Sequence, residues 1–174
     1  MSTFQVDLRG MVDLLSRNLY SGPRVYIREL LQNGLDAIEA RSALDPDCPR
    51  RVTITIEGRT LKCRDSGIGL TEEEAAGLLS TIGASSKRDE LGMARSDFLG
   101  QFGIGMLSCF MISDSITVYS RSAKSPDSPT VIWEGKTEGT YTTQPLSASD
   151  PHNLGEAGTE VVLEAHPGEP WIDP

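Results

Sequence analysis

Three polar residues at helical spacing, Glu29, Asn33 and Asp36, are candidates for catalysis or ligand binding. At about 100° per residue they lie within a narrow arc of one helix, where they could face a polar ligand. The apolar positions assigned to the opposite face are Ile27, Leu30, Leu31, Gly34, Leu35 and Ile38, the pattern of a helix that packs on a core. Asn and Asp are poor helix-interior residues, and exposed helix faces usually carry Lys, Glu and Ala. Two interpretations stay open here: an ordinary solvated face, or a stripe that faces a binding site.

A first glycine motif, Asp65-Ser-Gly-Ile-Gly69, joins the end of a predicted strand to a tight turn. Glycine permits positive φ and lets the backbone approach a flat ligand closely. A carboxylate there can accept a hydrogen bond from an exocyclic amino group such as that of adenine, a charge-assisted bond that contributes roughly 1.5–3 kcal/mol. Taken alone, the motif fits a surface turn better than a base pocket.

A second glycine motif, Gly100, Gly103 and Gly105, precedes the short apolar stretch Met106–Ile112, a predicted helix. Unpaired N–H groups at a helix start can hold a phosphate. The patterns GxxxxGK[ST] and GxGxxG are absent from the sequence, which disfavours a P-loop NTPase and a Rossmann domain.

The elements that would position these motifs alternate between helical and strand patterns. Thr71 and Glu74 fit a capping box at the start of a helix. Helices are predicted over residues 8–19, about 24–43, 72–79 and 106–112, and strands over 52–57, 60–64, 115–121, 130–134, 139–143 and 159–165. The sum is an α+β fold, a two-layer sandwich of helices on one mainly antiparallel sheet.

Bulk properties exclude several classes of protein. The 174 residues fit one globular domain, and the net charge of −9 disfavours a nucleic-acid-binding or anionic-membrane surface. The three cysteines lack a CxxC pair, so we expect small buried thiols in a reducing cytoplasm rather than a disulfide framework or a zinc site. No run approaches the roughly 18 apolar residues of a membrane span.

The ordered combination of these motifs resembles the GHKL ATPase superfamily, which includes gyrase-type topoisomerases, ninety-kilodalton heat-shock chaperones, histidine kinases and MutL mismatch-repair proteins. The segments most similar to the chaperone branch are Tyr26–Ile38, Asp65–Thr71, Thr81–Ser86 and Gly100–Gly105. The resemblance implies a Bergerat-type ATP-binding domain over residues 1–166, with a lid at about 82–99. Residues 167–174 would connect it to a middle domain.

The resemblance also implies roles for single residues. Glu29 would be the general base that activates water, and Asn33 would hold Mg²⁺. Asp65 would bind the adenine amino group with support from Thr159 through ordered water. The other nucleotide-binding positions that it implies are Asp36, Ala37, Gly69, Leu70, Gly100, Gln101, Phe102, Gly103, Ile104 and Gly105, among which Asp36 would support the local network. The sequence departs from the chaperone pattern at Leu78, Ala84 and Met106.

The implied function is that of an ATP-driven heat-shock chaperone that binds ATP or ADP and acts on client proteins as a homodimer. Turnover in the isolated domain would be slow, because the family uses an arginine from a following middle domain. The alternative is the ATP-binding module of another GHKL protein, either a DNA-handling ATPase or a histidine kinase.

Overall fold

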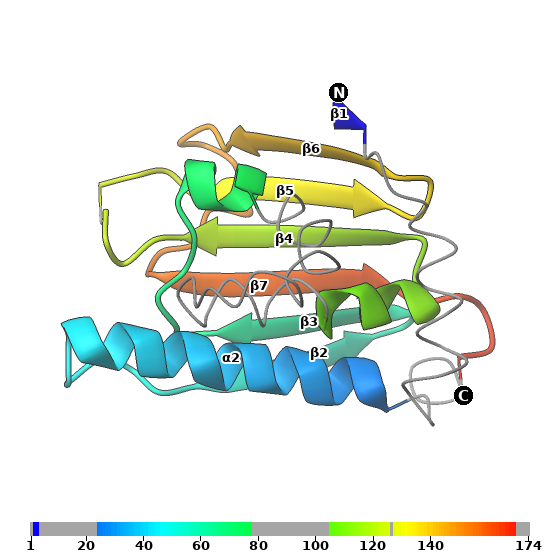
Figure 1. Cartoon of the computed structure of the whole chain (residues 1–174), viewed down its shortest axis with the longest axis horizontal. Helices are drawn as coiled ribbons and strands as arrows, with labels where there is room; N and C mark the ends of the chain where they lie inside the picture. The colour runs from blue at the N-terminus through cyan, green and yellow to red at the C-terminus, as the bar shows by residue number, and fades with distance from the viewer. Residues whose placement is uncertain (1, 4–23, 78–104, 126, 170–174) are drawn as a thin grey trace, which may run out of the picture.

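One antiparallel sheet forms the body of the protein (Figure 1). The computed structural model describes residues 2–3, 24–77, 105–125 and 127–169. Within these residues the sheet has seven strands in the order β1-β6-β5-β4-β7-β3-β2, and each neighbouring pair is antiparallel. The strands are β1 Ser2–Thr3, β2 Val52–Glu57, β3 Thr60–Asp65, β4 Ser115–Arg121, β5 Val131–Lys136, β6 Thr140–Pro145 and β7 Gly158–Glu164.

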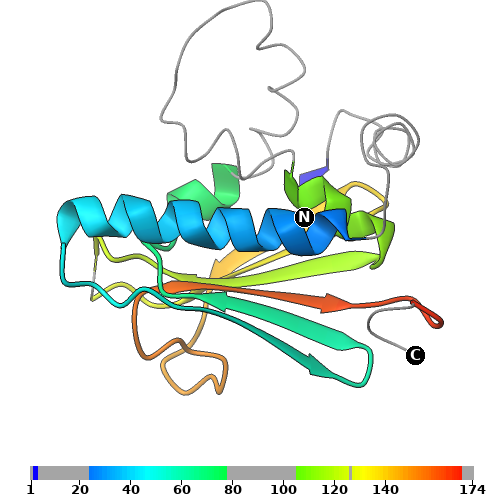
Figure 2. The same ribbon diagram turned by 90° about the horizontal axis from the view of Figure 1, so that it is seen from below.

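The helices of the described chain lie on one face of this sheet (Figure 2). They are the long helix α2, Val25–Leu44, a helical segment over residues 72–77, and the 3-10 helix η2, Leu107–Met111. The segment 72–77 begins with the predicted capping box: Thr71 N–H donates to Glu74 Oε2 (2.9 Å), and Glu74 N–H donates to Thr71 Oγ1 (3.2 Å). The predicted two-layer α+β sandwich is therefore confirmed.

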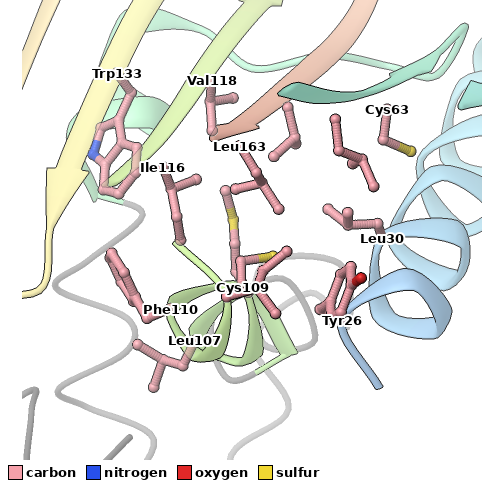
Figure 3. Packing of buried hydrophobic residues seen from close by; sticks show 14 of the residues in the cluster. Tyr26, Leu30, Cys63, Leu107, Cys109, Phe110, Ile116, Val118, Trp133 and Leu163 are labelled. Atoms are coloured by element: carbon pink, nitrogen blue, oxygen red, sulfur yellow. The ribbon is translucent and has the colours of Figure 1, made fainter. Parts of the chain in front are cut away.

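The core lies between this sheet face and the helices, as Figure 3 shows. Alternate residues of the central strands point inward and form rows across β3, β7 and β4. One row contains Leu61, Leu163 and Ile116, and the next contains Cys63, Val161 and Val118. These buried rows hold α2 and η2 against the sheet and fix the strand register, because a one-residue slip would turn the apolar side chains to the other face.

The predicted apolar face of α2 is partly wrong. Leu31 and Leu35 are 37% and 56% exposed, whereas Asn33 and Ala37 are buried against the sheet side. The helix is rotated toward the small residues Gly34 and Ala37, which let it lie close to the end of β3. There the Ile68 N–H donates to the Ala37 carbonyl at 2.9 Å. Part of the polar stripe therefore points inward.

Other expectations have mixed outcomes. The strand predictions hold to within two residues at each end, but β1 was not predicted, because two residues carry no alternation signal. Cys48, Cys63 and Cys109 are buried thiols, as expected. The predicted helix over 8–19, the lid over 82–99 and the residues Gly100–Ile104 lie outside the described residues. Among the described helices, none is long and apolar enough to cross a membrane.

Truncation of a core leucine tests this packing. Leu163 is fully buried in the first apolar row, so Leu163→Ala should lower the free energy of unfolding by about 2–5 kcal/mol. Leu35→Ala, on the exposed side of α2, should change it by less than about 0.5 kcal/mol. Urea unfolding followed by circular dichroism measures both, and equal losses would contradict the described core.

Candidate functional site

A buried polar row continues the two apolar rows of the core. Asp65 on β3 pairs with Thr159 on β7, and Thr159 pairs with Ser120 on β4. All three residues are nearly inaccessible, with 6%, 3% and 2% of their surface exposed. Burial of three polar side chains costs free energy unless each finds a partner. A polar row in this position is therefore a candidate ligand site.

Of the three side chains in the row, the carboxylate of Asp65 costs the most free energy to bury. Burial raises its pKa to about 7, and this effect outweighs the opposing effects of the Gly67 N–H, the charge of Arg64 and the Thr159 N–H. The Gly67 N–H donates to Asp65 Oδ1 at 2.8 Å. A buried acceptor of this kind is suited to bind an amino group of a ligand.

The turn after β3 closes tightly around the polar row. The Leu70 N–H donates to Ser120 Oγ at 2.8 Å, and the Ala123 N–H donates to the Ile68 carbonyl at 2.7 Å. Gly69 has a φ of +66°, and a Cβ at this position would lie 1.9 Å from the Arg121 carbonyl oxygen. Only glycine fits there, so the turn can hold its backbone close to the row.

The polar stripe of α2 borders the same region. Asn33 is 5% exposed, and its Nδ2 has no hydrogen-bond partner among the described residues. Asp36 accepts a hydrogen bond from Gln32 Nε2 at 2.9 Å on one oxygen, while its buried Oδ2 has no described partner. Unpaired buried polar atoms are rare in native proteins and are expected where a ligand or water binds.

Glu29 lies against the first residue of the helical segment that leads into η2. A Cβ added to Gly105 would meet Glu29 Oε2 at 2.3 Å, so the glycine leaves the space that this carboxylate fills. Ser108 Oγ donates to the Gly105 carbonyl at 2.5 Å and holds that backbone in place. The stripe and the second glycine motif are thus neighbours at Glu29 and Gly105.

The described residues place Asp65, Thr159, Gly69, Leu70 and Ala37 around the polar row, whereas Glu29 and Gly105 form a separate contact. Ala37 contacts the turn through its carbonyl, and Leu70 contributes its N–H, while its side chain is buried in the core. Gly100, Gln101, Phe102, Gly103 and Ile104 lie outside the described residues. Sequence reasoning missed Ser120. The alternation Ile116, Val118, Ser120 along a predicted strand could have placed its side chain inward.

Comparisons with known proteins agree with this geometry. Residues 20–159 match the family model described as "Histidine kinase-, DNA gyrase B-, and HSP90-like ATPase". The chain is similar to proteins named "Chaperone protein HtpG" from Cronobacter sakazakii (33% identical), Yersinia pestis (34%) and Escherichia coli (32%). Each alignment covers 95% of this chain and 28% of the relative, so the chain spans less than a third of the length of these curated relatives.

Substitution of Gly69 tests the turn. Gly69→Ala should lower the free energy of unfolding by at least about 2 kcal/mol, because alanine is strained at this φ and collides with the Arg121 carbonyl. Gly155→Ala is the matched control, since no atom of the described residues lies within 4 Å of a Cβ at Gly155. Urea unfolding should show almost no change for the control. A tolerated Gly69→Ala would contradict the described turn.

The raised pKa of Asp65 predicts an unusual pH dependence of stability. Above about pH 7 the carboxylate is ionised in the folded state, and the full cost of its burial lowers stability. This cost disappears as the pH falls toward 3.8, the ordinary pKa of an aspartate. Asp65→Asn should therefore be more stable than the wild type at about pH 8, by on the order of 2–4 kcal/mol, and the two should converge near about pH 4.

Denaturant unfolding at a series of pH values measures this difference. Asp47→Asn, in the exposed loop before β2, is the control and should show no such pH-dependent gain. An Asp65→Asn variant that is less stable than the wild type at every pH would contradict the assigned cost of the buried charge.

Proposed function

Because the chain belongs to the histidine kinase-, DNA gyrase B- and HSP90-like ATPase family, we propose that it is the nucleotide-binding unit of a heat-shock chaperone that binds and hydrolyses ATP. The observation that carries the proposal is the buried row of Asp65, Thr159 and Ser120, together with two buried polar atoms of α2 that have no partner among the described residues. The row supplies a base pocket, and the stripe of α2 supplies the polar groups for the phosphate end.

Adenine recognition is assigned to Asp65. Its carboxylate accepts a hydrogen bond from the exocyclic amino group, and Thr159 supports the base beside it. The close turn at Gly69 packs against the Arg121 and Gly158 backbone and so holds the loop after β3 in place beside Asp65. Because Asp65 is almost fully buried, its charge is compensated best when a donor from the ligand reaches it.

Hydrolysis is assigned to Glu29. Its carboxylate orients a water molecule and accepts a proton as the water oxygen bonds to the γ-phosphorus. The bond from that phosphorus to the bridging oxygen breaks, which gives ADP and phosphate. The contact between Glu29 and Gly105 supports this role, because Gly105 is the last glycine of the second motif.

The residues also fit a magnesium ion at the phosphate end. No group of three His, Cys, Asp or Glu side chains within the described residues could hold a metal ion alone. Mg²⁺ in nucleotide sites is commonly held by one or two protein oxygens together with phosphates and water. The Nδ2 atom of Asn33 is buried without a partner among the described residues, and rotation of the end group would put the amide oxygen at that position as one such ligand. The ion would neutralise phosphate charge, and Asp36 would support Asn33 from the next turn.

The chaperone assignment is supported by the similarity of 95% of this chain to the named HtpG proteins. We propose client proteins as the substrates of the full assembly, a homodimer as its functional form, and the cytoplasm as its location. A DNA-handling ATPase or a histidine kinase remains the alternative, since the family model also includes gyrase-like and kinase-like members. The net charge of −9 favours the chaperone over a DNA-handling protein.

Calorimetric titration with ADP and ATP tests the base pocket. Asp65→Asn should weaken both nucleotides by about one to two decades, because it removes a charge-assisted hydrogen bond of roughly 1.5–3 kcal/mol. Asp47→Asn should bind like the wild type. Unchanged nucleotide affinity in Asp65→Asn would overturn the adenine assignment.

A second variant separates binding from turnover. Glu29→Ala should keep ADP affinity within about threefold of the wild type, yet lose phosphate release from ATP, because only the attacking water depends on this carboxylate. Glu39→Ala, an exposed glutamate on the same helix, should retain both properties. Residual turnover at the wild-type rate in Glu29→Ala would remove Glu29 from the role of base.

A further inference from the structure

Arg41 ties the last turn of α2 to two other segments of the chain. Its Nη1 donates to the Ser66 carbonyl at 2.9 Å and to the Ala157 carbonyl at 3.2 Å. A cation in the last turn of a helix is favourable by itself, because the carbonyl dipoles of the helix point toward that end. These bonds do more, since both acceptors lie outside the helix.

The two carbonyls flank the site end of one strand pair. The ladder between β3 and β7 ends at the pair Asp65–Thr159. Ser66 is the first residue after β3, and Ala157 is the last residue before β7. Arg41 therefore bridges the two strands immediately beyond their last pair.

The same face of α2 also holds the turn after β3. One helical turn before Arg41, the Ala37 carbonyl accepts the Ile68 N–H at 2.9 Å. Glu29 and Asn33 lie farther toward the start of this helix. The bonds of Arg41 and Ala37 thus fix where the base end of the proposed nucleotide site lies relative to its phosphate end.

The buried carboxylate of Asp65 works against a closed strand end. Asp65 is 6% exposed, and water that reached it would relieve the cost of its burial. In the protein without nucleotide this cost favours separation of the strand ends, whereas the charge-assisted bonds of Arg41 oppose it. We propose that Arg41 is a positioning residue that keeps the ends of β3 and β7 together, so that the base pocket is formed before nucleotide binds. This inference rests on the proposed nucleotide function.

Arg59 provides a matched control at the opposite end of the same strands. It precedes β3, and its Nη1 donates at 3.2 Å to the carbonyl of Ala165, the residue after β7. Its Nη2 also donates to Glu164 Oε1 at 3.3 Å. Both arginines are half-buried, and each links β3 to β7 at one end. Arg41→Met and Arg59→Met should therefore each lower the urea midpoint of unfolding.

Calorimetric titration of the full 174-residue chain with ADP separates the two ends, at a temperature where every variant is folded. Arg41→Met should weaken ADP binding about tenfold, because the pocket is then formed in only about a tenth of the folded molecules. Arg59→Met should stay within about twofold of the wild type. Arg41→Lys keeps the charge on a shorter side chain and should fall between the two, and it replaces Arg41→Met if that variant does not fold.

The pKa of Asp65 distinguishes positioning from a general loss of stability. A carbon-13 NMR titration without nucleotide should show this pKa falling in Arg41→Met from about 7 toward the ordinary 3.8, because water reaches the carboxylate. Loss of a positive charge by itself could only raise the pKa, so a fall reports an opened strand end. Arg59→Met should keep the wild-type value.

Three results would overturn the proposal. They are an ADP affinity of Arg41→Met within about twofold of the wild type, equal weakening by Arg41→Met and Arg59→Met, and an unchanged Asp65 pKa in Arg41→Met. Failure of the proposed function looks different, because the wild type would then not bind ADP, or Asp65→Asn would bind it as tightly as the wild type does.

Discussion

One constraint explains the arrangement of the site: the Asp65 carboxylate is buried at the end of the hydrophobic core, where its charge is unfavourable. Burial raises its pKa to about 7, so the folded protein without a ligand carries a charge that it does not compensate well. An asparagine there would remove the buried charge and keep an acceptor for the Gly67 N–H. The surrounding elements form a frame that keeps this carboxylate buried at the end of the core, where the proposed nucleotide base would meet it.

That frame comes from strand register and close backbone contacts. Two apolar rows across β3, β7 and β4 fix the register, and the same register then aligns Asp65, Thr159 and Ser120. Helix α2 lies close to this end of the sheet because Gly34 and Ala37 are small. The turn around Gly69 contributes two N–H groups to the row: Gly67 N–H binds Asp65, and Leu70 N–H binds Ser120. Packing of the core therefore positions the site, with few contacts between the polar side chains themselves.

Much of this arrangement could be predicted from the sequence, and the failures have physical reasons. Alternation and capping patterns are local, so the strands and the capping box at Thr71 were predicted well. The rotation of α2 depends on tertiary contacts, so Leu31 and Leu35 were wrongly placed in the core and the burial of Asn33 was missed. Alternation along β4 could have placed the Ser120 side chain inward, but its alignment with Thr159 and Asp65 exists only after three strands pair. The segment β1 is too short to show a pattern.

The central claim is that Asp65 is held in a costly state that a nucleotide base relieves, and a carbon-13 NMR titration of its side-chain carboxyl tests this most directly. The account predicts a pKa of about 7 in the free protein and a clear fall when ADP is bound, since a donor from the base favours the ionised form. A pKa near the ordinary 3.8 in the free protein, or no change with ADP, would contradict it.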